Sequence, residues 1–259
     1  MTEPRFIACA PTPNTPVPVE VLRAAGEDQV VPVWRNGLGG LTFKLIGASS
    51  LRFAKWSPRP EQAEDIAPLA PQEMDLNHEV QRLSWASNYS VVPTVLSFEE
   101  FDAGQLMVTE GLMGMSVISE IGQKEPALAS LALGAGLREL HTRLPVADCP
   151  FEWNVASRTA PLPQDLGARF IEQAPPEDLV VCHGDACAPN TLIDSHFRFV
   201  GHVDLGMLGI GDRWADLSIA ALSTRWNFGP GFEQYVYDGY EIEPDDQKID
   251  FYRRLWDAT

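Results

Sequence analysis

The sequence predicts an α+β protein in two parts: a small half rich in antiparallel strands, with one main helix, and a larger, mostly helical half. Two observations carry this prediction. Up to about residue 110, apolar and polar residues alternate in short runs, as in half-buried strands. From residue 128 to 144, leucines recur at helical spacing. We place a hinge around residues 110–114, so that the parts comprise residues 1–110 and 111–259.

The small half is expected to contain five strands and a helix. Prolines in residues 1–20 favour loop or edge structure there, so regular structure is expected to begin near Val30. A helix is expected over residues 75–85, because Leu76, Val80 and Leu83 form an apolar stripe. The runs that alternate as strands are 30–35, 41–45, 51–56, 91–96 and 105–109.

The larger half is expected to alternate helices with short strands. The leucine-rich segment 128–144 predicts its first long helix. Short apolar runs predict strands at 179–182, 191–193 and 197–203. We find no internal repeat and no low-complexity tract.

The composition limits the partners of the chain. With 36 acidic and 19 basic residues among 259, the formal net charge is -17, which repels nucleic acids and anionic membrane surfaces. A cationic small molecule would be attracted, although an acidic surface that only aids solubility is the alternative interpretation. No apolar run approaches the ~20 residues that span a bilayer, and neither a CxxC pair nor a signal-peptide pattern is present. We expect a cytoplasmic protein, monomeric or a weak dimer, that binds neither nucleic acid nor membrane.

A polar constellation follows the predicted strands at 179–182 and 197–203. Its two segments are His183-Gly184-Asp185-Ala186-Cys187-Ala188-Pro189-Asn190 and His202-Val203-Asp204-Leu205-Gly206. Phosphoryl transfer explains these residue types: Asp185 would orient and deprotonate a hydroxyl nucleophile, and Asn190 and Asp204 would offer hard oxygen ligands to Mg²⁺. The Asp-x4-Asn spacing equals that of the protein-kinase catalytic loop, and Asp-Leu-Gly stands where such enzymes carry Asp-Phe-Gly.

Two other interpretations of this constellation stay open. Asp185 could cap a turn while Asn190 bonds its own backbone. A zinc site could form from Cys182, His183, Cys187 and His202, although their spacing lacks a CxxC or HxxxH pair. We interpret His183 instead as a residue that braces the loop through a backbone group or a carboxylate.

The small half offers a cation for nucleotide phosphates. Lys55 ends the third predicted strand, and Glu79 points to the buried side of its helix, where an unpaired charge would be costly. A Lys55–Glu79 ion pair removes that cost. Lys44 is the competing cation and Glu79 could be a surface charge instead. The turn at residues 36–40 matches neither GxGxxG nor a Walker A motif, which argues against a P-loop.

With these residues in place, the sequence resembles the aminoglycoside 3'-phosphotransferase family over most of its length. The resemblance rests on Asn36-Gly37-Leu38-Gly39-Gly40, Phe53-Ala54-Lys55-Trp56, the segment 78–85 around Glu79, Val108-Thr109-Glu110-Gly111, Arg138-Glu139-Leu140-His141, Cys149-Pro150-Phe151, the segments 180–187 and 211–217, and Phe251-Tyr252-Arg253-Arg254-Leu255.

The resemblance implies a bilobal protein-kinase-like fold, with a nucleotide-binding lobe at 1–110 and a catalytic, acceptor-binding lobe at 111–259. It implies ATP or GTP with Mg²⁺ as cofactors and a cationic acceptor, an aminoglycoside. Residues near the nucleobase would be Val108, Glu110 and Gly111. Braces of the catalytic loop would be Asp212, Arg213 and Asp216. Carboxylates at Asp257 and at the end of Thr259 would bind substrate ammonium groups, unless this terminus is simply solvated.

Departures from the family pattern concern the acceptor. Met207 stands where the family usually has an arginine, only 27 residues separate Phe151 from Leu179, and Trp226 stands where an acidic contact is expected. The acceptor could therefore be another small alcohol, such as a different antibiotic, an amino alcohol or a sugar. A catalytically silent nucleotide-binding module is the alternative from a different class.

Overall fold

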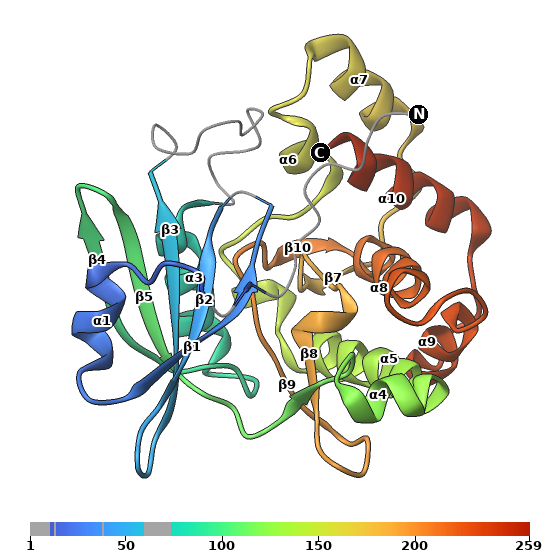
Figure 1. Ribbon diagram of the computed structural model, residues 1–259. Coiled ribbons are helices and arrows are strands. Elements are labelled where there is room, and N and C mark those ends of the chain that lie inside the picture. The colour runs from blue at the N-terminus through green and yellow to red at the C-terminus, as the bar shows by residue number, and fades with distance from the viewer. Residues whose placement is uncertain (1–10, 13, 38, 60–73) are drawn as a thin grey trace. The chain divides into compact units, whose positions relative to one another are not determined.

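The computed structural model describes residues 11–12, 14–37, 39–59 and 74–259 (Figure 1). The chain divides into two compact units: unit 1 comprises Met1–Ser84 and Pro93–Leu112, and unit 2 comprises Trp85–Val92 and Met113–Thr259. The α+β class is confirmed. The assignment of nucleotide binding to 1–110 and of catalysis to 111–259 stays a prediction.

Unit 1 contains a five-stranded sheet in the order β1-β2-β3-β5-β4. Its strands are β1 (Gln29–Arg35), β2 (Leu41–Ile46), β3 (Leu51–Pro58), β4 (Val95–Phe101) and β5 (Gly104–Glu110). Every neighbouring pair is antiparallel, as predicted. The main helix, α3 (Leu76–Ala86), lies within one residue of its predicted bounds. Leu38 of the predicted turn at 36–40 lies outside the described residues.

A short helix precedes the sheet, where we expected no regular structure before Val30. Helix α1 (Val19–Ala25) begins directly after Pro18, whose fixed φ is compatible with a helix start. Val21 and Ala25, one turn apart, bury their side chains in the core of the sheet beside Phe43. The expectation was wrong for this segment because the prolines end just before it. Residues 1–10 lie outside the described part.

Strand β4 is displaced from the predicted 91–96. It begins at Val95 and runs to Phe101, and a two-residue turn joins it to β5. Pro93 has no N–H to give to a ladder, so the strand forms after it. The consecutive Glu99 and Glu100 interrupt the apolar alternation, which hid this strand in the sequence.

Unit 2 is mostly helical. Its helices are α4 (Glu120–Lys124), α5 (Pro126–Arg143), α6 (Val155–Thr159), α7 (Gln164–Gln173), α8 (Arg213–Phe228), α9 (Glu233–Tyr240) and α10 (Asp246–Ala258). The predicted leucine helix is α5, whose Leu133, Leu137 and Leu140 are fully buried. Gly134 of α5 packs so closely on α9 that a Cβ there would collide with the carbonyl oxygen of Val236.

Two small antiparallel sheets in unit 2 carry the polar constellation. One pairs β7 (Leu179–Cys182) with β10 (Gly209–Asp212). The other has the order β6-β8-β9, formed by β6 (Met115–Ser116), β8 (Thr191–Ile193) and β9 (Phe199–His202). The polar loop 183–190 therefore connects one sheet to the other, and Asp204 is the second residue after β9.

The segment Trp85–Val92 joins unit 2 through aromatic contacts. The indole N–H of Trp85 donates to the carbonyl of Asp148 at 3.2 Å. The Trp85 ring meets Phe151 edge to face, with the ring centroids 6.1 Å apart. Within the described ranges, no helix is long and apolar enough to cross a membrane.

Candidate functional site

The loop after β7 turns sharply at Gly184. This glycine has φ +87°, and a Cβ there would collide with the backbone carbonyl of Met207. Only glycine suits both the left-handed conformation and the close approach. Position 184 thus holds the loop that carries Asp185 directly against the segment after Asp204.

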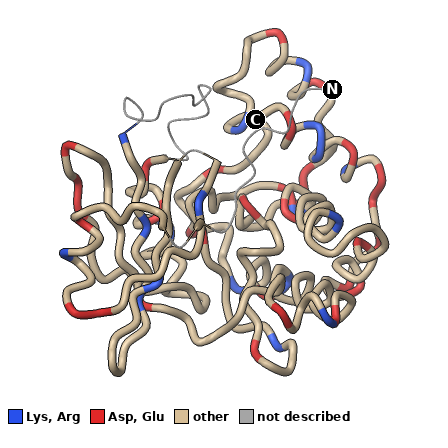
Figure 2. Tube along the Cα trace, viewed as in Figure 1, with Lys and Arg blue, Asp and Glu red and all other residues tan. Residues whose placement is uncertain are grey.

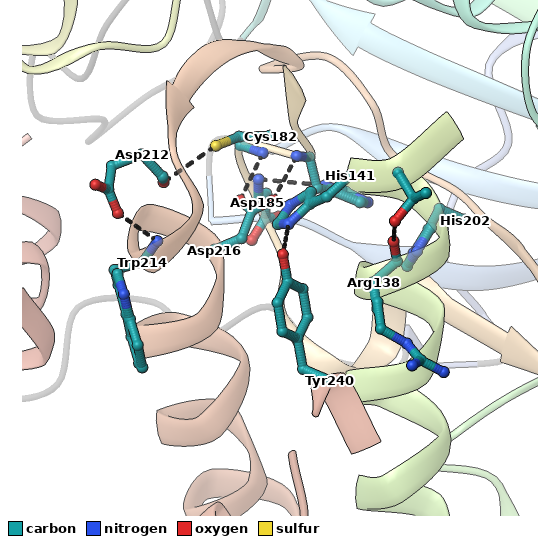
Figure 3. A network of polar contacts seen from close by, with 12 residues as sticks. Arg138, His141, Cys182, Asp185, His202, Asp212, Trp214, Asp216 and Tyr240 are labelled. Carbon is teal, nitrogen blue, oxygen red and sulfur yellow. Dashed lines mark hydrogen bonds and ion pairs between the residues drawn. The ribbon is translucent and has the colours of Figure 1, made fainter. Parts of the chain in front are cut away.

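Asp216 of α8 anchors this loop through two backbone amides (Figure 3). Its Oδ2 accepts a hydrogen bond from His183 N at 2.6 Å, and its Oδ1 accepts one from Gly184 N at 3.0 Å. Asp216 is only 1% exposed. Burial raises the pKa of Asp216, but the hydrogen bond and positive charge of His141 and the backbone N–H of His183 outweigh it and lower the pKa below its usual value. Asp216 therefore stays ionised and holds the loop as a charged acceptor.

A second layer of polar residues supports Asp216. His141 of α5 places Nε2 2.9 Å from Asp216 Oδ2 and Nδ1 2.9 Å from the hydroxyl of Tyr240 in α9 (Figure 3). Further along α8, Ser223 Oγ accepts a hydrogen bond from Ala188 N at 2.9 Å. Three helices of unit 2 therefore determine where the loop lies.

His183 ties the loop to the chain after β9. Its ring Nδ1 accepts from Asp185 N at 3.2 Å, so Nε2 carries the proton and donates to Val203 O at 3.0 Å. His183 is fully buried. His183 and Asp216 thus make contacts of the bracing kind that we expected of them, and their part in catalysis stays a prediction.

Asp185 and Asn190 face each other across the loop. Asn190 Nδ2 donates to Asp185 O and to Asp185 Oδ2, both at 3.0 Å. The other carboxylate oxygen of Asp185, Oδ1, is buried and has no hydrogen-bond partner in the described part of the chain. Burial raises the pKa of Asp185, and the negative charge of Asp204 raises it further, while hydrogen bonds from the Cys187 thiol and the Asn190 amide oppose the rise.

These three residues fit a divalent cation. The carboxylates of Asp185 and Asp204 repel one another, and Oδ1 of Asp185 has no hydrogen-bond partner in the described part of the chain. A positive charge would stabilise both carboxylates. Because the amide nitrogen of Asn190 donates to Asp185, its carbonyl oxygen is the atom that would ligate a metal. Asp204 has φ +64°, a conformation uncommon outside glycine that is often found at functional sites.

In unit 1, Lys55 of β3 and Glu79 of α3 form an ion pair. Lys55 Nζ lies 2.8 Å from both carboxylate oxygens of Glu79, which is 5% exposed. This pairing resolves the cost of burying Glu79, and it selects Lys55 over Lys44 as its partner. That Lys55 and Glu79 serve a nucleotide stays a prediction.

The residues expected near a nucleobase lie at the end of β5. Val108 is 2% exposed in the core of the sheet. Glu110 N donates to Thr94 O and Gly111 N donates to Leu51 O, each at 2.8 Å. Both N–H groups are therefore engaged within unit 1, so a contact with a base would use other backbone atoms of these residues.

Asp212 and Arg213 support the strand before the loop. Asp212 Oδ2 accepts from Lys248 Nζ at 2.6 Å and from Asp178 N at 2.8 Å, while Oδ1 caps α8. Arg213 pairs with Asp178, with Nη2 and Oδ2 2.8 Å apart. Among the described residues, neither side chain bonds residues 183–190, so any bracing by them acts through the start of β7.

The expected substrate carboxylates at the end of α10 differ in their surroundings. Asp257 is exposed. Thr259 Oγ1 accepts a hydrogen bond from Arg158 Nη2 at 3.3 Å and donates to Leu255 O at 2.9 Å. An ammonium group near Thr259 would meet the positive charge of Arg158, which disfavours the role expected for this residue.

The alternative zinc site is not supported by the geometry. Where the chain is described, the residues whose ligand atoms gather closely are His141, Cys182 and Asp216, not the expected four. His141 and Asp216 are bonded to each other, and burial raises the pKa of the Cys182 thiol, against the thiolate that zinc needs. His183 is engaged by Val203 and Asp185.

Sequence reasoning missed the roles of His141, Tyr240 and Ser223. His141 was noted only as part of the family pattern. A signal for it existed, because it continues the buried stripe of Leu133 and Leu137 at helical spacing, where a lone polar residue needs a partner. Nothing in the sequence pointed to Tyr240 or Ser223, whose contacts depend on how the helices pack.

Comparisons with known proteins bear on this site. A sequence profile of the phosphotransferase enzyme family matches residues 46–252. The aminoglycoside 3'-phosphotransferase of Streptomyces fradiae is 30% identical over 250 residues, covering 84% of this chain and 90% of that protein. The streptomycin 3''-kinase of Streptomyces griseus is 30% identical over 252 residues, covering 84% and 87%.

A solved structure is similar to this chain over most of its length. The aminoglycoside phosphotransferase APH(3'')-Id of Streptomyces rimosus, in complex with ADP and streptomycin, aligns with a TM-score of 0.66 at 26% identity. The alignment covers 93% of this chain and 97% of that one.

Proposed function

The chain belongs to the phosphotransferase enzyme family, and from this premise we propose that it is a kinase acting on aminoglycosides. The family resemblance drawn from the motifs and the protein-kinase-like fold that it implied are confirmed. The donor is a nucleoside triphosphate, ATP or GTP. The acceptor is a hydroxyl group of a polycationic small molecule.

One observation carries the proposal: the anchoring of the loop that holds Asp185. Asp216 binds the amides of residues 183 and 184, and Asn190 binds the Asp185 carboxylate. A base for phosphoryl transfer needs a fixed position more than unusual reactivity, because most of the rate comes from orientation and charge stabilisation. The loop supplies that fixed position.

Asp185 acts as the general base. It orients the acceptor hydroxyl, whose oxygen forms a bond to the γ-phosphorus while the bond from that phosphorus to the β–γ bridging oxygen breaks. The hydroxyl proton passes to Asp185, and the nucleoside diphosphate leaves with the bond's electron pair. The buried, unpartnered Oδ1 of Asp185 is the atom best suited to receive this proton.

Asn190 and Asp204 would hold Mg²⁺ through an amide oxygen and a carboxylate. When bound, Mg²⁺ neutralises negative charge on the phosphate oxygens. The left-handed backbone conformation of Asp204 takes the chain away from the extended course of β9. His183 keeps this segment beside the loop through its hydrogen bond to Val203.

Lys55 binds the nucleotide phosphates in this proposal, and Glu79 keeps its ammonium group in place. Val108, Glu110 and Gly111 contact the nucleobase. These roles follow from the family resemblance and from the Lys55–Glu79 ion pair. They predict that Lys55→Met weakens nucleotide binding, whereas loss of Asp185 does not.

The acceptor is the least constrained part of the proposal. The net charge of -17 favours a polycation. The chain is 30% identical both to a 3'-phosphotransferase and to a streptomycin 3''-kinase, so identity does not choose between these acceptor hydroxyls. Trp226 is 57% exposed, and Arg158 rather than an acid lies beside Thr259. These features favour a second candidate function, a kinase of another small alcohol.

The test is a transfer assay with purified protein, Mg²⁺, ATP or GTP, and a panel of acceptors. The panel contains streptomycin, kanamycin, a macrolide, an amino alcohol and a sugar. Nucleoside diphosphate release should depend on the acceptor, whose mass should increase by one phosphoryl group. Transfer to no aminoglycoside would reject the narrower proposal, and nucleotide binding without any turnover would favour a silent module.

Asp185→Asn should lower kcat by about 10²- to 10⁴-fold, because the amide cannot accept the proton. Nucleotide affinity, measured by calorimetry, should remain close to that of the parent protein. Asp250→Asn, an equal change on the exposed face of α10, is the control and should leave the rate unchanged. An unaltered kcat in Asp185→Asn would remove this residue from the mechanism.

A further inference from the structure

The turn that presents Asn190 has a partner for each of its backbone polar groups. This single 3₁₀ turn, η3 (Ala188–Asn190), ends the loop that carries Asp185 and leads directly into β8. The chain close to the turn supplies three of its bonds: Asn190 N to Cys187 O, Thr191 N to Ala188 O, and Val203 N to Asn190 O. Pro189 has no N–H, so the groups left to bond are Ala188 N and Pro189 O.

Ser223 of α8 bonds the first amide of the turn. Its Oγ accepts a hydrogen bond from Ala188 N at 2.9 Å, and both residues are fully buried. Asn227, one helical turn further along α8, donates from Nδ2 to Ser223 O at 2.8 Å and to Ser223 Oγ at 3.2 Å. Because Ala188 is sealed from solvent, water cannot replace the Ser223 hydroxyl as its acceptor.

Ser116 of β6 bonds the carbonyl in the middle of the turn. Its Oγ donates to Pro189 O at 2.9 Å and accepts from Ile118 N at 3.3 Å. β6 also pairs with β8, the strand that follows Asn190, in an antiparallel ladder. Two serine hydroxyls, from elements far apart in the sequence, therefore complete the bonding of the turn.

The position of the Asn190 side chain follows from that of the turn. Its Nδ2 donates to Asp185 O and to Asp185 Oδ2, both at 3.0 Å. The amide oxygen, which is the atom able to ligate a cation, is thus fixed by the backbone of the turn on one side and by Asp185 on the other. Groups that hold a metal ligand in one orientation contribute strongly to metal affinity.

We propose that Ser116 and Ser223 are positioning residues, a serine pair that fixes the turn and so places the Asn190 amide oxygen for a divalent cation. This inference rests on the proposed function, which assigns that cation to Asn190 and Asp204. Each serine acts through one backbone atom of the turn. A hydroxyl suits both places, because it accepts from the N–H of Ala188 and donates to the carbonyl of Pro189.

The first test is the affinity of the protein–ADP complex for Mn²⁺, measured from the electron paramagnetic resonance signal of free Mn²⁺, which needs no turnover. Ser223→Ala leaves Ala188 N buried without an acceptor, so the turn should shift and the Kd of Mn²⁺ should rise by about tenfold or more. An unchanged Kd overturns the proposal. If Ser223→Ala does not fold, Ser116→Ala at a half-buried position decides by the same measure.

Other serine changes provide the controls. Ser218 lies on the same helix as Ser223 and is equally buried, but its hydroxyl has no hydrogen-bond partner in the described part of the chain. Ser218→Ala should therefore leave the Kd of Mn²⁺ unchanged. Ser116→Thr keeps the hydroxyl on a strand, where a β-branched residue is accommodated, and should keep the parent Kd. An equal rise in Ser218→Ala and Ser223→Ala would show a general loss of packing in α8 and overturns the positioning role.

Hydrogen exchange tests the serine pair without any ligand. The amides of Ala188 and Asn190 should exchange about tenfold faster in Ser223→Ala than in the parent protein, and at the parent rate in Ser218→Ala. Unaltered exchange in Ser223→Ala overturns the inference.

The two measurements together separate the inference from the proposed function. A parent protein that binds no Mn²⁺ with ADP, although Ser223→Ala speeds exchange at Ala188, contradicts the metal site of the proposed function and with it the metal role of the serine pair. Mn²⁺ binding with the same Kd in the parent, Ser116→Ala and Ser223→Ala contradicts the serine pair alone.

Discussion

Among the described carboxylates that bond the loop at residues 183–190, Asp216 makes the most polar contacts. Its two oxygens serve the amides of His183 and Gly184 and the ring of His141, all without access to solvent. A carboxylate suits this position because it only accepts, and each of its neighbours offers an N–H. The buried charge of Asp216 thereby fixes the geometry of the loop.

Asp216→Asn should destabilise unit 2 and slow transfer together. The amide keeps the shape but sets an NH₂ group against a backbone N–H, which leaves buried donors unsatisfied. The loss in the free energy of unfolding should be about 3 to 5 kcal/mol, as for other broken buried charge pairs. Urea denaturation measures the stability, and kcat of the folded fraction reports the displacement of Asp185. A variant as stable and as active as the parent would contradict this account of the loop.

The same contact sets a response to acid. The folded-state pKa of Asp216 is lowered, so its contribution is complete above its ordinary unfolded value, about 4, and is lost as pH falls through the folded pKa. Between about pH 5 and pH 2, the parent protein should lose more stability than Asp216→Asn does. Urea midpoints across this range measure the difference. Parallel losses would show that other groups dominate the acid response.

At the scale of elements, the contact of α5 with α9 depends on backbone approach. A Cβ at Gly134 would collide with the carbonyl oxygen of Val236, and one at Gly239 with that of Leu131. Glycine inside a helix is normally a cost relative to alanine. Here it allows the helices to lie close enough for the His141–Tyr240 hydrogen bond behind Asp216.

Gly134→Ala should therefore lower stability, against the usual helix trend. The added methyl group has to push α9 away, at a cost of about 1 to 3 kcal/mol. Gly167→Ala in α7 is the matched control, since its Cβ would come no closer than 3.2 Å to its nearest neighbour, Thr159 O. Thermal unfolding compares the two. A stabilised Gly134→Ala would mean that α5 and α9 are not in close contact.

Much of the fold could be predicted where a local pattern is strong. The strands at 179–182 and 191–193 have the predicted bounds, and α5 follows from its leucines. β10 could not be predicted, because Gly209-Ile210-Gly211-Asp212 has poor strand propensity. Its glycines are needed instead for close approach, since a Cβ at Gly209 or Gly211 would meet the backbone of Glu152 or Trp153.

The residues of the candidate site also differ in whether a local sequence pattern predicts them. Asp185, Asn190 and Asp204 stand out in the sequence because their spacing reflects one short loop and hairpin. The supporting residues come from α5, α8 and α9, and no local pattern links His141 to Tyr240 across 99 positions. Ser116 was missed for a related reason: a lone serine is ordinarily read as solvated, and only packing shows that its hydroxyl bonds Pro189 O.

On the scale of the whole molecule, the charge is distributed rather than concentrated. Figure 2 shows acidic residues along both units, with basic residues among them. The net charge of -17 thus acts as a broad field that attracts cations. Such a field assists the approach of a polycation without specifying its binding site.

Ionic strength should consequently affect the two substrates differently. Raising it from about 0.02 M to about 0.3 M shortens the Debye length about fourfold and screens the field. The KM of a cationic acceptor should rise by about threefold to tenfold, because electrostatic steering weakens. The KM of the anionic nucleotide should change less or fall. Initial rates measure both, and an acceptor KM that is insensitive to salt would contradict a role for the net charge.

The two loop amides held by Asp216 also affect the local opening of the protein. Loops that perform chemistry usually open first, and their N–H protons exchange quickly with solvent deuterium. The amides of His183 and Gly184 should instead exchange as slowly as those of the central helix α5, because freeing them exposes a buried carboxylate. Residue-resolved hydrogen exchange should show two slowly exchanging amides within a turn. Rapid deuterium uptake at these two amides would mean that their hydrogen bonds to Asp216 are not maintained in solution.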